Sequence, residues 1–470
     1  MNKKLDSFFK ISERGSNVRT EIIAGLTTFF AMAYIVVTNP NQVVGFNLGG
    51  VYEPIWNAVY VASILAAVVG TLLYAFYAKL PFAQACGMGL NSFFFVSFIL
   101  PNIVDPLNGY RQGLCIILLS GIIFLILSVT GARKYIAKAL PDCLKKAIPA
   151  GIGLFIAFIG FKNVGIIQEN PYTFVQFFDF HGAIADKPVF DAWKAIAPVV
   201  LALLGFFAIA VLEKKKVKGS VIITIAGVTV LYYLTTWTLP SFDLGKVGQS
   251  FKDFGELGLF GAFKGFDIFK GGSGAIINAI VLVVTFCLVD MFDTIGTLYG
   301  TASQADMLDE NGDPVNIDES MMSDSVATVS GAVFGTSTCT TFVESAAGVA
   351  AGGRTGLASL VTAICFAACL FLTPIAAIVP TCATAPALIY VGVLMLKNFA
   401  KVDMSDITAA VPAFLALIMM PLTYSISNGI AIGAISYVII AAVTGKYTKK
   451  DIVVTGIAIL FTLRFFLVTY

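Results

Sequence analysis

Charged side chains are scarce in this sequence. Asp, Glu, Lys and Arg together make up 12% of its 470 residues, whereas an average soluble chain carries about 25%. The formal net charge of +2 points to no particular partner. The Lys and Arg clusters fit topology signals better than a nucleic-acid surface, so we expect no nucleic-acid partner.

Residues for metal or nucleotide chemistry are also few. There is one histidine, His181, and no HExxH motif, so a zinc hydrolase would lack its ligands. The sequence contains no P-loop, which argues against an ATP-driven pump. The eight cysteines include no CxxC pair, and most lie in apolar stretches, where cysteine behaves as a small buried hydrophobe. We therefore expect no cofactor and no enzyme.

Long apolar segments fill most of the chain. Hydrophobic residues make up 58% and the mean hydropathy is +0.88, which predicts an all-α polytopic membrane protein. We expect seven segments before a polar, Gly-rich stretch and seven after it. The expected segments are near 22–43, 55–78, 82–100, 113–130, 147–167, 195–212, 219–238, 275–299, 322–335, 342–353, 357–376, 380–396, 408–424 and 428–444.

A further apolar stretch, 452–468, contains Arg464 and does not fit the division into two sets of seven segments. It either lies on the inner surface of the membrane or pairs with another helix. Residues 1–21 are polar and basic and show no cleavable signal peptide, so we expect them to form a cytosolic tail.

The basic loops are consistent with that orientation, because cytoplasmic loops are enriched in Lys and Arg. With a cytosolic N-terminus, every basic cluster falls inside and residues 240–274 fall outside. We therefore expect a multi-pass protein of the bacterial inner membrane. The basic residues concerned are Lys3, Lys4, Arg133, Lys134, Lys138, Lys145, Lys146, Lys214, Lys215, Lys216, Lys218, Lys397, Lys401, Lys446, Lys449 and Lys450.

Seven crossings are an odd number, so the second half must have inverted topology. Spacing supports a repeat: 58 residues separate Ala33 from Asn91, and 54 separate Asp290 from Glu344. Inverted repeats with a site at the membrane midplane are a common plan of transporters. The predicted fold is therefore 14 transmembrane segments arranged as two inverted repeats of seven.

Three acids lie inside otherwise apolar segments: Asp290, Asp293 and Glu344. One carboxylate at the centre of a membrane helix costs ~3 kcal/mol on insertion scales, so three oppose insertion by roughly 9 kcal/mol. Such groups persist mainly where they bind a ligand, carry protons or line a water-filled path. The acids predict a transporter with its site in mid-membrane.

Two segments are predicted to be broken. Pro81, Gly87 and Gly89 discourage a continuous helix in segment three, and the β-branched run 336–343 favours an extended strand in segment ten. We expect two short antiparallel strands, each turning into a half-helix near Asn91 or Glu344. Both half-helix N-termini would then point at one central place.

At these residues the chain resembles the AzgA-like branch of the nucleobase–cation symporters, within the nucleobase–ascorbate transporter superfamily. This branch contains the purine permeases for hypoxanthine, adenine and guanine. The matching stretches lie in both halves of the chain. They are RTEIIAGLTTFFAMAYIVVTNP (19–40), GMGLNSFFF (87–95), GIGLFIAFIGFKNVGII (151–167), VDMFDTIGTL (289–298) and TTFVESAAGVAAGGRTGLAS (340–359).

The resemblance implies a core domain and a gate domain, with a homodimer formed through the gate. It also implies proton symport, in which the core moves against the gate like an elevator. The implied divisions are a tail (1–21), core (22–135 and 275–378), gate (136–240 and 379–470) and an extracellular linker (241–274).

By matching motif, Asn91, Asp290 and Glu344 correspond to the family's essential polar positions, and Asp293 to one that tunes the substrate. We expect Thr341, Phe342 and Phe94 to contact the substrate as well. The sequence departs from the family pattern at Cys86, at the bulky Phe94 and Phe95, and at Phe342, which replaces an expected Tyr. These departures put the substrate preference in doubt more than the class.

Guanine and hypoxanthine are the favoured substrates, with adenine as a further one. Glu344 would accept hydrogen bonds from the purine, and Glu344 or Asp290 would carry the proton. A same-fold transporter of uracil, xanthine or an inorganic anion is the alternative, and a channel stays open. An intramembrane aspartyl protease would place its acids on two helices, whereas Asp290 and Asp293 share one, and GxGD is absent.

Overall fold

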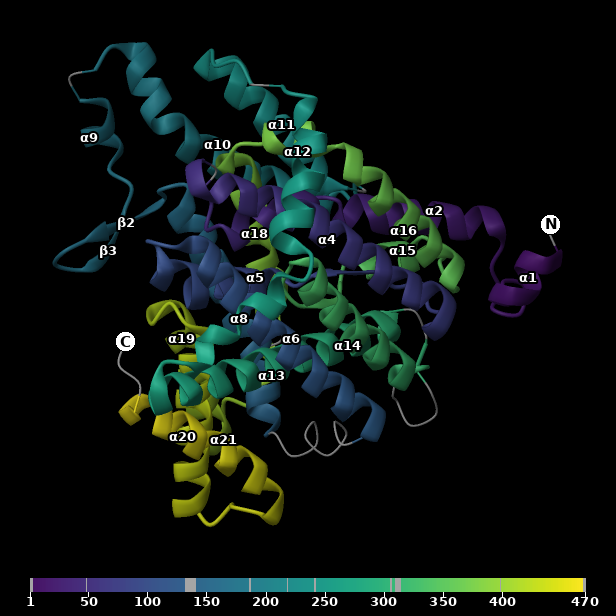
Figure 1. The fold of residues 1–470 in the computed structure, drawn as a ribbon, viewed down its shortest axis with the longest axis vertical. Coiled ribbons are helices and arrows are strands. Elements are labelled where there is room, and N and C mark those ends of the chain that lie inside the picture. Colours follow the sequence, from purple (N-terminus) through teal and green to yellow (C-terminus); the bar gives the residue numbers. More distant parts are fainter. Residues whose placement is uncertain are drawn as a thin grey trace.

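A computed structural model describes the protein (Figure 1). The described residues are 3–47, 49–131, 141–185, 187–217, 219–240, 242–304, 307–308, 314–397 and 399–467. Among them, eight helices are long and apolar enough to cross a membrane. The prediction of a mostly helical, multi-pass membrane protein is confirmed. The basic residues Arg133, Lys134, Lys138 and Lys218 lie outside the described residues.

Some helices of the first half begin or end at residues suited to those places. The Asn17 side chain caps α2 by accepting from the Thr20 N–H; Asp105 caps α6, which ends at Gly131 in the left-handed region. The helices are α1 (Lys3–Phe9), α2 (Val18–Met32), α3 (Ile35–Val43), α4 (Glu53–Leu73), α5 (Met88–Phe94), α6 (Pro106–Thr130), α8 (Asp142–Asn163), α9 (Phe180–Ile184), α10 (Val189–Lys214) and α11 (Ser220–Thr236).

The second half begins with α12 in the stretch expected to be a linker. Its longest helix is α13, which carries two of the three membrane acids. The helices are α12 (Gly245–Asp253), α13 (Gly272–Gln304), α14 (Ile317–Phe334), α15 (Ser345–Ala350), α16 (Gly356–Ala368), α17 (Thr373–Ala377), α18 (Thr381–Leu396), α19 (Ile407–Leu422), α20 (Ile426–Val443) and α21 (Ile452–Leu467).

Two short, buried strands pair with each other. β1 (Gln84–Cys86) pairs antiparallel with β4 (Cys339–Thr341), and these strands fall in segments three and ten. The Thr71 hydroxyl of α4 bonds both the N–H and the C=O of Gln84, while the Thr328 hydroxyl of α14 does the same for Cys339. Each strand therefore has a threonine from the preceding helix that satisfies its outer backbone groups.

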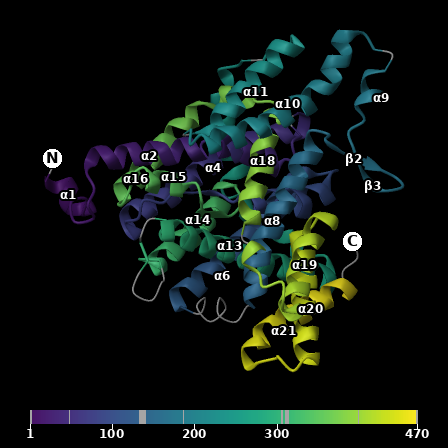
Figure 2. The same ribbon diagram turned by 180° about the vertical axis from the view of Figure 1, so that it is seen from behind.

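The helices fall into two packing groups. In one, α2 contacts α15 and α16, and α14 contacts α4 and α6. In the other, α8 contacts α18, α19 and α20, and α10 contacts α11 and α18. Figures 1 and 2 show α2, α15 and α16 side by side at one side and α19, α20 and α21 gathered at another. Gly348 permits the close contact of α15 with α2, since a Cβ there would lie 2.0 Å from the Thr28 hydroxyl.

Two stretches form secondary structure that was not predicted from the sequence. Residues 167–177 form a hairpin of β2 (Ile167–Asn170) and β3 (Phe174–Phe177). The expected linker contains α12, which packs on α4. There Asp253 accepts a hydrogen bond of 2.8 Å from the buried Asn57 amide, so a polar residue in α4 holds the linker in place.

The C-terminal helix α21 pairs with other helices. Arg464 is only 6% exposed, and its guanidinium donates to Asn428 of α20 and to Asn278 of α13, both at 3.1 Å. Since Arg464 is near the end of α21 and Asn428 near the start of α20, the two helices run antiparallel. The second of the two expected placements of 452–468 is therefore observed.

Replacing Arg464 with Leu should destabilise the protein by about 1–3 kcal/mol, because two partly buried amide acceptors would lose a charged donor. Thermal unfolding of purified protein in detergent measures this. Lys450→Leu, at an exposed lysine, serves as the control and should change little. Equal melting temperatures for Arg464→Leu and wild type would contradict the assignment.

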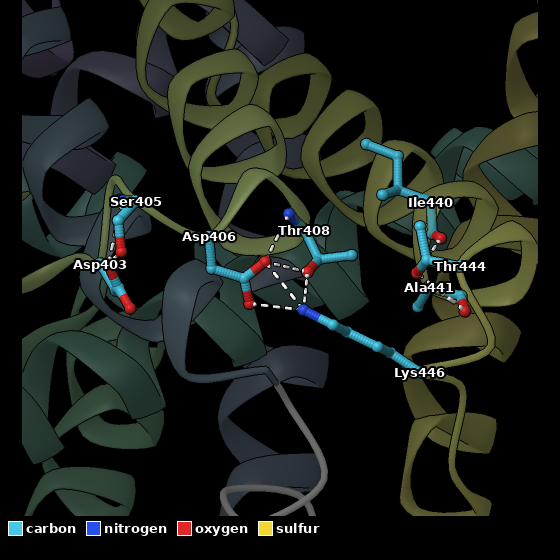
Figure 3. A network of polar contacts seen from close by, with 8 residues as sticks. All are labelled: Asp403, Ser405, Asp406, Thr408, Ile440, Ala441, Thr444 and Lys446. Carbon is cyan, nitrogen blue, oxygen red and sulfur yellow. Dashed lines mark hydrogen bonds and ion pairs between the residues drawn. The ribbon is translucent and has the colours of Figure 1, made fainter.

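A polar network outside the membrane segments joins the start of α19 to the end of α20 (Figure 3). The Lys446 ammonium lies 2.9 Å and 3.0 Å from the two Asp406 oxygens and 2.8 Å from the Thr408 hydroxyl. Hydrogen bonds from the Thr408 side chain, then from Lys446, lower the pKa of Asp406 from 3.8 to about 2.

Because the folded pKa is lowered, the contribution of Asp406 to stability is complete above about pH 4, where the unfolded carboxyl is ionised. It is lost as the pH falls through the folded value. Melting temperatures between pH 2 and 7 should therefore converge at the acid end for wild type and Asp406→Asn, with wild type higher at pH 7. Asp191→Asn is the control; parallel curves for Asp406→Asn would refute this role.

Candidate functional site

The site is built where β4 turns into α15. Glu344 occupies the residue before α15, three residues after the end of the paired strand. On the other side Gly87 precedes α5. The two broken segments thus bring Glu344 and the start of α5 to the same central region, as the strand pairing requires.

A cavity of about 280 Å³ opens beside these turns. One wall consists of α8 and α18 of the second group. The other consists of α5, α13, β4 and the turn 342–344 that leads into α15, which contacts α2 of the first group. Its lining residues are Gly87, Met88, Gly89, Pro149, Ile156, Asp293, Thr297, Thr340, Thr341, Phe342, Val343, Glu344, Val391, Leu394, Met395, Lys397 and Lys401.

Two carboxylates and one aromatic ring face this cavity. Asp293 and Glu344 are partly exposed, while Phe342 is 5% exposed. The Tyr34 hydroxyl donates to Glu344 over 2.6 Å and so fixes the direction of that carboxylate. Tyr34 lies at the break between α2 and α3. Its place in the 19–40 motif was the one feature of the sequence that pointed to it.

Behind the cavity wall, two aspartate–threonine pairs join α13 to α14. Thr328 of α14 donates to Asp290 of α13 at 2.8 Å, and Thr294 of α13 donates to Asp324 of α14. The members of each helix are four residues apart and therefore share a face. Asp290 and Asp324 are both fully buried. We refer to these four residues as the Asp–Thr ladder.

Asp324 is a buried acid that sequence reasoning missed. It lies near the start of the expected segment 322–335, shortly after the acidic stretch 301–320. The signal that could have found it is the repeated spacing: Asp290 precedes Thr294 by four, as Asp324 precedes Thr328.

The remaining predicted site residues lie away from the cavity. The Asn91 amide is fully buried; it donates to Gln42 at 3.3 Å and accepts from Ser337. Phe94 is also buried, with its ring 5.3 Å from Phe98. Glu344, Asp293, Thr341 and Phe342 are thus brought together, whereas Asp290, Asn91 and Phe94 are not.

The carboxylates of the site are not neutralised by close ion pairs. Over the described ranges, the ion pairs found are all remote from Asp290, Asp293, Asp324 and Glu344. The lysines that line the cavity are Lys397 and Lys401, and both are exposed. Within the same part of the chain no group of His, Cys, Asp or Glu is arranged to hold a metal ion. The arrangement suits a small, uncharged, hydrogen-bonding ligand better than an anion.

Comparison with known proteins shows the family. The sequence profile of the Permease family matches residues 19–432. This chain belongs to that family. Among its relatives, the guanine/hypoxanthine permease PbuO of Bacillus subtilis is 37% identical over 98% of this chain and 100% of its own length. The adenine permease AdeQ of Escherichia coli is 35% identical over 99% and 96%.

A putative permease of Methanocaldococcus jannaschii, MJ0326, is 36% identical over 98% of both chains. The resemblance stated from the sequence motifs is confirmed by these full-length matches. It covers both halves of the chain, including the strand turns and the membrane acids.

Solved structures of low sequence identity share the fold. The transmembrane domain of a cyanobacterial bicarbonate transporter, BicA, has a TM-score of 0.60 at 14% identity and covers 88% of this chain and 97% of that one. The murine Solute Carrier 26 family member A9 anion transporter, in its inward-facing state, has a TM-score of 0.56 at 13% identity, covering 90% and 68%. At these identities the likeness concerns the fold alone.

A cysteine placed at Met395, which lines this permease's cavity, should react with a water-soluble methanethiosulfonate reagent in membranes. Phe94→Cys should not react, because that position is fully buried. Mass spectrometry of the labelled peptides distinguishes them from the native cysteines, most of which are buried. Equal labelling at both positions would show that the cavity is misplaced.

Proposed function

We propose that this permease imports purine nucleobases together with protons, with guanine and hypoxanthine favoured and adenine as a further substrate. The observation that carries the proposal is the cavity, where two carboxylates meet the ring of Phe342 without a neighbouring ion pair. Support comes from the relatives, which are named guanine/hypoxanthine and adenine permeases and match over nearly their whole length.

A purine is flat and uncharged and carries N–H donors on its edge. Ionised Glu344 would accept two hydrogen bonds from the N1–H and 2-amino group of guanine, and one from hypoxanthine. Charge-assisted bonds of this kind are the strong ones. The Phe342 ring would contact the purine face, and Asp293 would receive a second N–H from another edge of the base.

The acids also support proton coupling. Sequence reasoning assigns the coupling proton to Glu344 or Asp290, and both are without a basic ion-pair partner over the described ranges. Asn91 would orient the start of α5 through its contacts with Gln42 and Ser337. Asp290 would act from behind the cavity wall, where it accepts from Thr328, and would not contact the base.

The two packing groups support a core-and-gate division with the boundaries expected from the sequence. The cavity lies between them, so a sliding movement of the core would carry the bound purine past the gate. The matching roles of Thr71 and Thr328 support two inverted repeats of seven segments. Lys397 and Lys401 at the cavity lining support an opening toward the cytosol, since basic residues favour that side.

The alternative substrates gain no support from the site. An inorganic anion would meet the Asp293 and Glu344 carboxylates beside the strand turns, while the two lysines of the lining are exposed. The fold likeness to anion transporters carries no information on the substrate. Uracil is smaller than a purine, and xanthine carries other hydrogen-bonding groups on its edge than guanine. None of the described cavity residues is specific for either base.

The test is uptake of labelled guanine, hypoxanthine and adenine by purine-uptake-deficient cells that express wild type or Glu344→Gln. The variant should lose about 10- to 100-fold in apparent affinity, because a charge-assisted hydrogen bond to the base becomes a neutral one. Glu169→Gln, in the exposed hairpin, should transport normally.

Membrane abundance is measured in parallel, so that loss of protein is not mistaken for loss of affinity. No purine uptake by wild type, or normal uptake by Glu344→Gln, would refute the proposed site. Equal competition by uracil, xanthine, adenine and guanine would refute recognition by hydrogen bonds, since a site built for specific donors rejects analogues that lack them.

A further inference from the structure

Asp324 is a fully buried carboxylate to which the proposed purine site gives no task. Two hydroxyls donate to it: Thr294 of α13, and Thr341 of β4 at 3.0 Å. The hydroxyl of Tyr74 lies 2.6 Å from that of Thr341. The acid is thus held by neutral donors from two different elements, α13 and β4.

These donors connect Asp324 to the cavity. Thr341 lines the cavity and bonds Asp324 directly, and Thr340, also in the lining, lies 2.9 Å from the Thr294 hydroxyl. A hydroxyl both donates and accepts, so it can pass a proton on. One path from the cavity to Asp324 therefore passes through a single hydroxyl, that of Thr341. The other passes through two, those of Thr340 and Thr294.

The titratable groups around Asp324 are acids and weak acids. Asp290 and Asp293 face it from α13, and Tyr74 faces it from the turn after α4. Cys339 faces it from β4, with Cys86 of β1 behind. Over the described ranges, no lysine or arginine forms an ion pair with Asp324.

Several buried negative charges without a cation are costly, and such groups avoid the cost by taking up protons. A protonated Asp324 is neutral and can stay in the low-dielectric core while the core moves. An ionised Asp324 next to Asp290 adds an unpaired charge to that movement. The protonation state of Asp324 thus changes the free energy of moving the core, although Asp324 does not contact the purine.

We propose that Asp324 takes up the coupling proton, with Asp290 as the second acid of the proton site and Glu344 left to bind the purine. The proton enters from water in the cavity. The Thr341 hydroxyl passes its own proton to the Asp324 oxygen, forming an O–H bond there, and regains one from a hydronium ion in the cavity, which becomes water. This inference rests on the proposed purine–proton symport and assigns its proton to a residue outside the cavity lining.

The experiment uses purified full-length protein in liposomes, with two assays on wild type and Asp324→Asn. The first measures exchange of labelled guanine against unlabelled guanine inside, which needs no net proton movement. The second measures accumulation of labelled guanine driven by an imposed inward proton gradient. Asp324→Asn should keep exchange within about threefold of wild type, while gradient-driven accumulation falls to the level without a gradient.

Asp253→Asn is the matched control, because Asp253 is also a buried carboxylate held by neutral amides, but it lies in α12. It should keep both activities. If Asp324→Asn fails to fold, Thr294→Val replaces it; this variant removes one donor to Asp324 outside the cavity lining. It should slow gradient-driven accumulation about tenfold with exchange retained.

Full accumulation by Asp324→Asn, or by Thr294→Val where that variant is used, would overturn the inference and leave the proposed purine transport standing. Loss of both activities in folded Asp324→Asn would also overturn it, since the acid would then serve substrate binding. If wild type exchanges no guanine, the proposed function fails, and the inference falls with it. Exchange by wild type without response to the proton gradient would refute proton coupling and this assignment together.

Discussion

The Asp–Thr ladder between α13 and α14 is the interaction on which the site depends. Extended backbone is tolerated at membrane depth only where protein or water satisfies its polar groups. Thr328 does so for Cys339 of β4 and at the same time donates to Asp290, while Asp324 accepts from Thr341 at the other end of the strand. The ladder therefore supports the extended backbone of β4 in addition to its pairing with β1.

The rest of the site follows from the direction of β4. The strand ends at Thr341, so Phe342 and Glu344 turn into the cavity directly after it. Tyr34 then fixes the Glu344 carboxylate from the break between α2 and α3. One layer of buried polar residues holds the strand, and a second layer lines the cavity. The proposed proton-binding role falls to the first layer and the proposed purine-binding role to the second.

The sequence predicted the elements that are costly in a membrane. Acids in apolar segments, and breaks caused by Pro81, Gly87 and a β-branched run, are visible because each violates the pattern of a simple spanning helix. Which acids face the cavity was not predictable. Asp290 and Asp293 are three residues apart and lie only about 60° apart around a helix, so the position of α14 decides that Asp290 turns inward to Thr328 while Asp293 lines the cavity.

Residues with ordinary local surroundings were missed for the same reason. Tyr34 lies in an apolar stretch, and its role comes from its hydrogen bond to Glu344, which is 310 residues away. The order of α12 depends on Asp253 meeting Asn57, 196 residues earlier. Such pairs arise from the packing of distant helices, and neither periodicity nor propensity carries information about them.

The most direct test of the account is calorimetric binding of guanine and 1-methylguanine to the purified protein. The methyl group removes the N1–H that the Glu344 carboxylate is proposed to accept and places a bulky group against it. We predict that 1-methylguanine binds at least about 100-fold more weakly than guanine, since a buried charged acceptor would lose its donor. Equal affinities would contradict the central claim that Glu344 recognises the purine by that edge.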